Sequence, residues 1–448
     1  MPKKDLQTLK GFRDFLPEKA LEREKVFETI RSVFQKYGFL PLETPVLEYK
    51  EILSGKYGGE GEKLMYQFRD RGQRDVAMRY DLTVPLARVV AQYQSELAMP
   101  FKRYQIAPVW RADNTQKGRY REFYQCDVDV VGSDSITADA EIIACINEAL
   151  QSLGIKDVVI RINNRKILDA LLQNSGIPKN KILDAMRIID KLEKIGEPKV
   201  REELALLGIK TKGRQDLFET LNATFEDPKE ISVHLEAVPG AGELAAVVEI
   251  LLEWGIKNYQ IDLTLARGLD YYTGTIFEII LPDAPQYGSI AGGGRYDNLI
   301  GMFTSPNPLL SKERAKGEVP QPSRKAMAGT AAVGGSIGVD RLLAALEELE
   351  LIKYDLVSDV LVCNLAEELE EQYLAVTKQL RDSGIKTDFY YSPDKLDKQL
   401  KYADKKNINF AVIIGQDEQK KSEATVKNLS TGKQEKVKQK DLSKFLKK

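Results

Sequence analysis

The sequence predicts an α+β protein, in which an antiparallel sheet is interrupted by a helical insertion and followed by a separate α/β domain. Residues 101–132 alternate apolar and polar side chains on both sides of a basic loop, which is typical of a long β-hairpin. Residues 165–248 have helical spacing and dense charge between glycine and proline breaks. After Asp359, strand-like and helix-like segments alternate, as in a compact α/β domain.

The returning strand of the hairpin has one polar face. Because successive side chains of a strand point to opposite faces, one face would carry Phe123, Gln125, Asp127 and Asp129. The other face would carry Tyr124, Cys126, Val128 and Val130. An amide and two carboxylates beside an aromatic ring suggest the floor of a polar ligand site. A hairpin with one solvated face fits these residues equally well.

Around this hairpin, the first part of the chain supplies further helices and strands. We expect helices over 21–37, from near Pro85, and over 136–153. We expect strands near 64–68, 76–80, 158–162 and 259–265, and a mobile glycine-rich loop over 54–61. The segment 39–47 is strand-like but contains two prolines, which places it at a sheet edge or a subunit boundary.

Two polar segments lie where strands end, a usual place for ligand contacts. Arg79–Pro85 puts a charged pair and a hydroxyl between a strand and a helix, although Asp81 could equally cap that helix. Arg267, Tyr271 and Tyr272 are close together between two apolar strands, which is unusual for a simple turn.

Two glycine-rich segments follow. Gly292–Gly294 would let the backbone approach a ligand closely, but a triple glycine alone is more often a plain turn. Gly334–Arg341 opens a helix and is not a P-loop, because it lacks the GK[ST] ending. The proline-containing stretch 303–330 is expected to be an exposed loop of unassigned role.

Composition limits the chemistry and the cellular location. The chain is 43% hydrophobic and 30% charged with a net charge of -1, which is ordinary for a globular protein. His234 is the single histidine, which excludes mechanisms that need a histidine base elsewhere or a cluster of histidine ligands. Three cysteines lack metal or redox spacing, and no apolar run approaches the roughly 18 to 20 residues of a membrane helix. We therefore expect a cytoplasmic protein without membrane contact.

Charge is concentrated at the C-terminal end. Residues 395–448 contain fifteen lysines and seven acidic residues, a local balance of +8. Such a patch can attract a polyanion such as RNA, although a solvated surface explains it as well.

Taken together, these segments resemble the histidyl-tRNA synthetases, a family of class II aminoacyl-tRNA synthetases, over nearly the whole chain. The strand at Pro45 resembles the first class motif, 101–132 the second with its loop, and Gly338–Arg341 the third. Arg267–Tyr272 and Ala291–Asp297 are similar to two segments peculiar to the histidine enzymes.

This resemblance implies a fold, an activity and partners. It implies a catalytic core in two parts, 1–164 and 249–350, with a helical insertion at 165–248 and an anticodon-binding domain at 357–448. The implied activity is ATP-dependent ligation of L-histidine to tRNA(His) through a histidyl-adenylate, with release of AMP and diphosphate. A homodimer and Mg²⁺ with the ATP phosphates are also implied, whereas no metal site built by the protein is expected.

The resemblance also implies roles for individual residues. The catalytic cations are Arg111, Arg267 and Arg341. ATP would contact Arg111 at the α-phosphate, Arg119 and Arg341 at the outer phosphates, Phe123 at the adenine face and Asp113 at the adenine amine. Histidine would contact Asp81, Thr83 and Gln125 at its ammonium, and Asp129, Tyr271 and Tyr272 at its imidazole. The loop 114–118 is expected at the tRNA acceptor end.

Two other functions remain open from the sequence. One is a non-catalytic paralogue that keeps the synthetase fold as a histidine-sensing subunit of a biosynthetic transferase. The other is an RNA-binding module fused to an inactive nucleotide domain. The presence of all three catalytic arginines and of the C-terminal domain favours the enzyme over the first alternative.

Overall fold

The chain forms two compact units, residues 1–352 and 353–448. A computed structural model describes residues 6–116, 118–225, 227–267, 271–303, 330–352 and 358–447. The loop expected at 303–330 lies almost wholly outside the described residues, as do Lys117 in the hairpin loop and residues 268–270.

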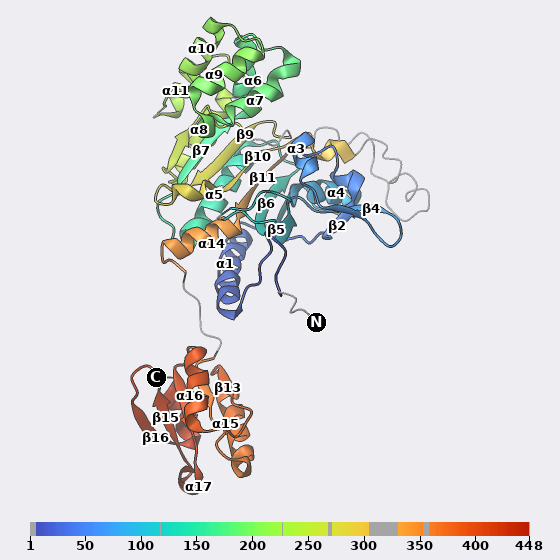
Figure 1. Cartoon of the computed structure of the whole chain (residues 1–448). Coiled ribbons are helices and arrows are strands. Elements are labelled where there is room, and N and C mark those ends of the chain that lie inside the picture. Colours follow the sequence, from blue (N-terminus) through green and yellow to red (C-terminus); the bar gives the residue numbers. More distant parts are fainter. Residues whose placement is uncertain are drawn as a thin grey trace. The chain divides into compact units, whose positions relative to one another are not determined.

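The larger unit is built on an eight-stranded sheet with the order β1-β5-β6-β11-β10-β9-β7-β8 (Figure 1). Its strands are β1 (Leu40–Pro41), β5 (Phe101–Trp110), β6 (Glu122–Val131), β7 (Val159–Asn164), β8 (Tyr259–Ile261), β9 (Thr275–Ile280), β10 (Ser289–Arg295) and β11 (Ala332–Gly338). The neighbours are antiparallel except for β1 with β5 and β7 with β8. The antiparallel core is therefore confirmed, and the proline-containing strand β1 lies at a sheet edge as predicted.

The predicted hairpin is formed by β5 and β6, which pair from Phe101 with Val131 to Trp110 with Glu122. Cys126, Val128 and Val130 are buried in the main apolar core. That core also contains residues of α1 (Pro17–Lys36), α5 (Ile136–Ser152) and α14 (Val339–Glu348), which cover this face of the sheet. The opposite face of β6 is left for polar side chains, in agreement with the predicted alternation.

A second, three-stranded sheet has the order β2-β4-β3 and lies beside short helices. These elements are β2 (Leu47–Tyr49), α2 (Lys50–Leu53), α3 (Gly58–Lys63), β3 (Gln67–Arg69), β4 (Asp75–Met78), α4 (Thr83–Tyr93) and η3 (Ile300–Phe303). The prediction of a mobile loop over 54–61 was wrong in its second half, where α3 begins. Tyr57 at the start of this helix is buried, with its ring centroid 4.7 Å from that of Tyr80.

Strand β8 is shorter than the predicted segment 259–265, because an aspartate turn stops it. The Oδ1 atom of Asp262 accepts hydrogen bonds from the backbone N of Thr264 at 2.9 Å and from its Oγ1 at 2.5 Å. A side chain that bonds to the backbone two residues later favours a turn over a continued strand.

The helical segment between β7 and β8 follows the position predicted for an insertion. It comprises α6 (Arg165–Asn174), η1 (Lys179–Lys181), α7 (Ile182–Ile189), α8 (Leu192–Ile195), α9 (Glu197–Leu206), α10 (Thr211–Leu221), α11 (Pro228–His234) and α12 (Ala241–Glu253). Helix α12 runs five residues beyond the predicted end at 248. The remaining short helix of this unit is η2 (Pro285–Tyr287).

The smaller unit is an α/β domain around a five-stranded sheet of order β13-β12-β14-β15-β16. The strands are β12 (Val360–Val362), β13 (Thr387–Phe389), β14 (Phe410–Ile413), β15 (Glu423–Asn428) and β16 (Gln434–Lys438). The helices are η4 (Glu367–Leu369), α15 (Glu370–Asp382), α16 (Leu396–Lys405), α17 (Gln416–Lys421), η5 (Gln439–Asp441) and α18 (Leu442–Leu446). In the described parts of both units, no helix combines the length and apolar character needed to span a membrane.

Candidate active site

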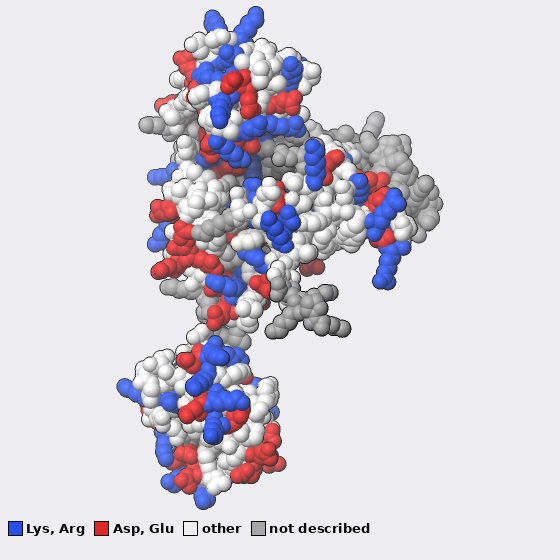
Figure 2. All heavy atoms as spheres, viewed as in Figure 1, with Lys and Arg blue, Asp and Glu red and all other residues white. Residues whose placement is uncertain are grey.

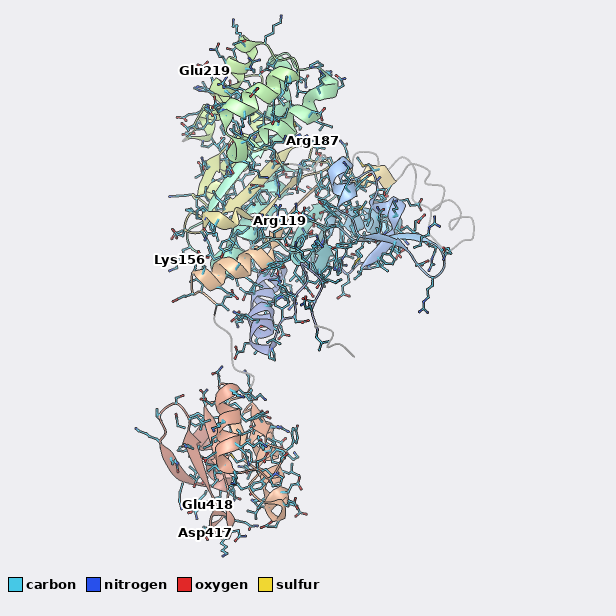
Figure 3. All side chains as sticks on the ribbon, viewed as in Figure 1. Arg119, Lys156, Arg187, Glu219, Asp417 and Glu418 are labelled. Atoms are coloured by element: carbon cyan, nitrogen blue, oxygen red, sulfur yellow. The ribbon has the colours of Figure 1, made fainter. Side chains whose placement is uncertain are left out.

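One cavity of about 430 Å³ in the larger unit brings together every site residue expected from the sequence. Its wall contains Asp81, Thr83, Arg111, Asp113, Arg119, Phe123, Gln125, Asp129, Arg267, Tyr271, Tyr272 and Arg341. These residues come from the start of α4, both sides of the hairpin, the segment before β9 and the start of α14. Figure 3 shows Arg119 near the middle of this unit, between the insertion and helix α1.

Three of the arginines in the wall are held by backbone carbonyl groups. Arg111 donates from Nε to the carbonyl of Tyr80 at 3.1 Å, and Arg267 donates from Nη1 to that of Phe277 at 3.1 Å. Arg341 donates from Nη1 to the carbonyl of Ser289 at 2.7 Å. These bonds fix the guanidinium groups and leave other N–H donors of each fork for a ligand.

The positive charges in this part of the cavity repel one another. Burial lowers the pKa of the Arg341 guanidinium, and the charges of Arg119, Arg111 and Arg267 lower it further, while Glu278 opposes them. A cluster of cations of this kind is electrostatically unfavourable when empty. It becomes favourable when an anion such as a polyphosphate lies between the charges.

Arg341 is positioned by the residue that precedes it. The Oδ2 atom of Asp340 accepts a hydrogen bond from the backbone N of Tyr124 at 3.0 Å, and Oδ1 pairs with Arg13 of the N-terminal segment. Asp340 thus fastens the first turn of α14 to strand β6. The segment that resembles the third class motif is therefore joined directly to the one that resembles the second.

The glycines of β10 allow the close packing that the site needs. A β-carbon at Gly292 would overlap Nη1 of Arg267, and one at Gly294 would lie 2.9 Å from Cδ1 of Tyr272. A β-carbon at Gly293 would overlap the backbone of Gly334. The triple glycine is part of a strand rather than a turn, so the plain-turn alternative is excluded.

At the acidic end of the cavity, Asp81 caps helix α4 and also lines the cavity. Its Oδ1 accepts hydrogen bonds from Oη of Tyr57 at 2.9 Å and from the backbone N of Val84 at 3.0 Å. The second bond caps the first turn of α4, while the carboxylate also lines the cavity. Burial raises the pKa of Asp81, since a charged carboxylate is poorly solvated there.

Gln125 and Asp129 lie on the polar face of β6, on either side of Asp127. Gln125 donates from Nε2 to Oγ of Ser336 at 2.8 Å. Asp129 accepts a hydrogen bond from Oη of Tyr296, and its Oδ2 lies 2.8 Å from Nη2 of Arg103. Burial raises the pKa of Asp129, whereas the positive charge of Arg103 opposes this effect.

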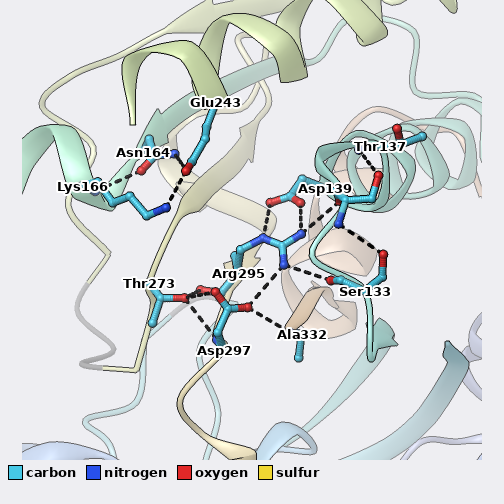
Figure 4. A network of polar contacts seen from close by, with 11 residues as sticks. Ser133, Thr137, Asp139, Asn164, Lys166, Glu243, Thr273, Arg295, Asp297 and Ala332 are labelled. Atoms are coloured by element: carbon cyan, nitrogen blue, oxygen red, sulfur yellow. Dashed lines mark hydrogen bonds and ion pairs between the residues drawn. The ribbon is translucent and has the colours of Figure 1, made fainter. Parts of the chain in front are cut away.

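The tyrosines beside Asp129 are supported by a buried polar network (Figure 4). Arg295, at the end of β10, donates to Asp139 of α5 at 3.2 Å and to the carbonyl of Ser133 at 3.1 Å. It also contacts Asp297, which accepts a hydrogen bond from Oγ1 of Thr273 at 3.0 Å. Thr273 directly follows Tyr271 and Tyr272, so the network fixes the position at which these rings enter the cavity. Their centroids are 5.0 Å apart.

Several wall residues were missed by the sequence analysis. They are Asp190, Glu278, Tyr296 and Ser336, with Tyr57 and Arg103 directly behind the wall. The hairpin pattern could have found Arg103, because pairing the strands from the loop outwards places it opposite Asp129. The others come from segments that only the tertiary fold brings to the cavity.

Comparisons with known proteins find matches to the sequences of both units. Residues 11–309 match the family model for histidyl-tRNA synthetase, and residues 359–448 match that for an anticodon-binding domain. The chain is 42% identical to the histidine–tRNA ligase of Rhodopirellula baltica, over 95% of this chain and 93% of that protein. The crystal structure of histidyl-tRNA synthetase from Nostoc sp. PCC 7120 has a TM-score of 0.82 and 35% identity, with 99% of each chain covered.

A more distant structural neighbour shows how widely the fold is used. The structure described as an ATP phosphoribosyltransferase regulatory subunit/histidyl-tRNA synthetase from Bacillus halodurans has a TM-score of 0.72 but only 21% identity, with 90% of this chain and 97% of that chain covered. This likeness is one of fold alone. The sequence match to the histidine–tRNA ligases, in contrast, extends over both the core and the C-terminal domain. The chain therefore belongs to the histidyl-tRNA synthetase family and has histidine–tRNA ligase activity.

Proposed function

We propose that the cavity carries out both steps of histidine–tRNA ligation. Histidine and ATP would first form histidyl-adenylate and diphosphate, and the histidyl group would then pass to the terminal ribose of tRNA(His) with release of AMP. The observation that carries this proposal is the division of one cavity into a cluster of four arginines and a row of acceptors. The substrates match this division, because polyphosphate is anionic and the ammonium and imidazole groups of histidine offer N–H donors.

In the first step the carboxylate of histidine attacks the α-phosphorus of ATP. Two anions must approach each other, and fixed guanidinium groups offset their repulsion. We assign Arg111 and Arg267 to the reacting α-phosphate and carboxylate, and Arg119 and Arg341 to the outer phosphates. Because these arginines stay protonated at physiological pH, the site works by positioning and charge rather than by proton transfer.

The adenine would stack on the ring of Phe123. The Arg111 guanidinium carbon is 5.1 Å from the centroid of the Phe123 ring, so this ring and the phosphate site are adjacent. Asp113 lines the same end of the cavity and offers an acceptor for the adenine amine.

The acidic end of the cavity would hold histidine. Asp81, Thr83 and Gln125 would surround its ammonium, and Asp129, Tyr271 and Tyr272 would surround its imidazole. Buried polar partners reject analogues that lack the matching groups more strongly than an apolar pocket does. This arrangement therefore accounts for selection of histidine without a separate proofreading site.

Magnesium would enter the reaction on the phosphates of ATP. Within the described ranges, no group of three or more His, Cys, Asp or Glu residues is arranged to hold a metal ion. Glu278, whose Oε1 is 3.7 Å from Nε of Arg267, is a wall carboxylate that could add one ligand to a phosphate-bound ion. The ion would neutralise charge on the outer phosphates.

Histidine-dependent exchange of labelled diphosphate into ATP tests the first step. We expect Arg111→Ala and Arg267→Ala each to reduce exchange by at least about a hundredfold, because each removes a preorganised cation. Arg31→Ala on the exposed side of α1 is the control for the same substitution outside the cavity. Exchange that persists in both cavity variants would contradict the assigned roles.

The same assay separates the enzyme from the two alternatives that the sequence left open, and binding of histidine or of tRNA separates those two from each other. A histidine-sensing paralogue would bind histidine without exchange, and an inactive RNA-binding module would bind tRNA without exchange. Exchange without charging of tRNA would restrict the proposal to its first step.

The smaller unit would bind the anticodon of tRNA(His). On the face shown in Figure 2, Lys and Arg side chains gather over α16, which carries Lys398, Lys401 and Lys405. Unpaired anticodon bases offer edges and faces to a protein, and nearby lysines can neutralise the phosphates. In the larger unit, the hairpin loop 114–118 would reach the acceptor end, although Lys117 lies outside the described residues.

We also propose a homodimer formed through the first class motif. Leu40, Val46, Leu47 and Phe68 have exposed fractions of 63%, 40%, 43% and 48%. They lie on or beside β1, β2 and β3, and exposed apolar side chains gathered at strand edges are typical of an interface.

A further inference from the structure

Arg13 contacts the chain neighbours of two cavity arginines. It belongs to the segment before α1 and is not part of the cavity wall. Its guanidinium carbon lies 3.2 Å from the centroid of the Tyr120 ring, and its Nη2 pairs with Oδ1 of Asp340. Tyr120 directly follows Arg119, and Asp340 directly precedes Arg341. A single side chain thus touches the neighbours of both cations that the proposed function assigns to the outer phosphates.

These contacts of Arg13 need the shape of a guanidinium group. Its carbon lies over the Tyr120 ring, and 4.8 Å from the centroid of the Phe15 ring, while Nη2 meets the buried carboxylate of Asp340. Arginine stacks on aromatic faces and donates from a planar fork, whereas the lysine ammonium is a point charge. Lysine at this position would keep a charge beside Asp340 but would lose the stacking.

The segment before α1 also holds the base of the loop between β5 and β6. The carbonyl of Gly11 accepts hydrogen bonds from the backbone N of Arg121 at 2.9 Å and of Glu122 at 3.3 Å. Gly11 has a φ of +88°, and a β-carbon there would lie 2.7 Å from Cγ of Arg121. The Nε of Arg121 donates in turn to the carbonyl of Asp113 at 3.2 Å, on the other side of the loop. The segment therefore holds the returning side of the loop through its backbone as well as through a side chain.

Arg119 and Arg341 need an anchor of this kind because their charges repel. Burial is the largest cause that lowers the pKa of the Arg341 guanidinium, and the charge of Arg119 is the next. The two cations belong to different elements, the hairpin loop and α14, which meet where a β-carbon at Gly118 would lie 3.4 Å from Cγ of Arg341. Because Arg13 is bound to both elements, it opposes their separation in the empty cavity. A site that is already arranged for its ligand loses less free energy on ordering when the ligand binds.

We propose that Arg13 is a positioning residue for ATP, which holds Arg119 and Arg341 at the spacing that the outer phosphates require. This inference rests on the proposed assignment of these two arginines to the outer phosphates. Arg13 acts without touching the substrate, so its effect depends on whether the ligand carries outer phosphates. A general support of the hairpin would instead affect every adenine nucleotide.

A comparison of ATP with AMP tests the inference in the full-length protein. AMP keeps the adenine, the ribose and the α-phosphate but lacks the outer phosphates. Binding of each nucleotide is measured by calorimetry at one Mg²⁺ concentration, without histidine or tRNA, for wild type, Arg13→Met and Arg13→Lys. For Arg13→Met we expect the affinity for ATP to fall at least about tenfold and that for AMP to fall less than about twofold.

Arg13→Lys should show a smaller loss of ATP affinity than Arg13→Met, because it keeps the ion pair but not the stacking. Unchanged binding of ATP in Arg13→Met, or an equal loss of ATP and AMP binding, would overturn the inference. Cooperative thermal unfolding shows that each variant is folded. If Arg13→Met does not fold, Arg13→Lys decides the matter by the same comparison of ATP with AMP.

Arg201→Met in the insertion is the matched control. The Arg201 side chain is 31% exposed, against 30% for Arg13, and its Nε lies 2.6 Å from Oε1 of Glu197. Its guanidinium carbon lies 4.2 Å from the centroid of the Phe218 ring, and it is not part of the cavity wall. We expect this substitution to leave both nucleotide affinities unchanged. A loss of ATP affinity equal to that in Arg13→Met would overturn the inference.

Arg341→Met and Arg119→Met in the same assay separate the inference from the proposed function. We expect the ratio of ATP to AMP affinity to fall in both, because each loses a cation that pairs with the outer phosphates. If the ratio falls in these variants but not in Arg13→Met, the assignment of the outer phosphates stands and the inference fails. If it falls in neither of them, the assignment itself fails, and the inference fails with it.

The double variant Arg13→Met/Arg341→Met tests the connection between the two residues. If Arg13 acts by positioning Arg341, its substitution should cost less ATP affinity in the Arg341→Met background than in wild type. Equal losses in the two backgrounds would overturn the positioning role.

Discussion

Gly334 on β11 faces Asp129 on β6 so closely that a β-carbon at position 334 would overlap Oδ1 of the carboxylate. The two residues are direct partners in the register of the two strands. The absence of a side chain at position 334 is therefore what gives this buried carboxylate its place beside Tyr296 and Arg103.

We expect Gly334→Ala to weaken histidine binding by at least about tenfold, because the new methyl group displaces Asp129 and the groups that it holds. Binding of ATP should change much less, since the arginine cluster lies at the other end of the cavity. Calorimetry with each substrate measures both effects. Gly242→Ala is the control, because a β-carbon at this helical position meets nothing within 4 Å. Equal histidine affinity in Gly334→Ala and Gly242→Ala would contradict the steric explanation.

Arg341 should lower the stability of the empty protein while it serves catalysis. Burial and the charges of Arg119, Arg111 and Arg267 disfavour its charged form. We expect Arg341→Met, which keeps most of the apolar stem, to raise the free energy of unfolding by about 1 kcal/mol and to abolish diphosphate exchange. Denaturant unfolding without ligand measures the first effect.

Added diphosphate provides the matching control for Arg341→Met. It should raise the melting temperature of wild type more than that of the variant, because binding to the native state stabilises it. A variant that is less stable than wild type, with an equal response to diphosphate, would show that Arg341 is a structural residue.

Asp127 should make stability depend on pH in a defined window. Its pKa rises from 3.8 to about 7 on folding, mainly through burial. The folded protein therefore binds the proton of the Asp127 carboxyl more tightly than the unfolded chain does. The stability that this proton binding contributes is lost as pH rises from about 4 to about 7. We expect Asp127→Asn to be more stable than wild type by a few kcal/mol above pH 7, with the difference shrinking towards pH 4. Denaturant unfolding at several pH values tests this, and a difference that does not vary with pH would contradict it.

Local pattern was enough to predict the strands of the hairpin, because their alternation of apolar and polar side chains is encoded residue by residue. The three glycines at Gly292–Gly294 were ambiguous, since nothing in the sequence shows what lies above a residue without a side chain. The helix at Gly58–Lys63 was missed because glycine disfavours helices, and the buried Tyr57 at its start overrides that preference.

The individual roles of the arginines and tyrosines of the cavity were predicted only through resemblance to a family, although Arg267, Tyr271 and Tyr272 stood out as a cluster at a strand end. Their convergence depends on contacts between segments far apart in the sequence, such as Asp340 with the backbone of Tyr124. The buried Arg103 was missed because an arginine in a strand gives no sign of whether it points to water or to a partner on the next strand. Its ion pair with Asp129 follows from the register of the hairpin.

The proposed dimer predicts a specific effect of charge in the first motif. We expect Leu47→Glu to convert a dimer into monomers, because a carboxylate in an apolar interface is poorly solvated. Sedimentation velocity measures the change. Leu206→Glu is the control, since Leu206 is also an exposed leucine, at 81%, but lies in the helical insertion. Monomers in wild type, or dimers in Leu47→Glu, would contradict the proposed interface.

Tyr391 in the smaller unit is expected to stack on a base of the tRNA. It is 83% exposed, its backbone carbonyl accepts a hydrogen bond from Nδ2 of Asn364 at 3.3 Å, and its ring lies 5.8 Å from that of Phe389. An aromatic ring that the protein holds at its surface can stack on an unpaired base, which contributes about 1–3 kcal/mol.

We expect Tyr391→Ala to raise the KM for tRNA at least about fivefold and to leave diphosphate exchange unchanged, because exchange needs no tRNA. Tyr391→Phe keeps the ring and should retain the wild-type KM. A normal KM in Tyr391→Ala would show that this ring takes no part in binding, and an equal rise in both variants would assign the effect to the hydroxyl group instead of stacking.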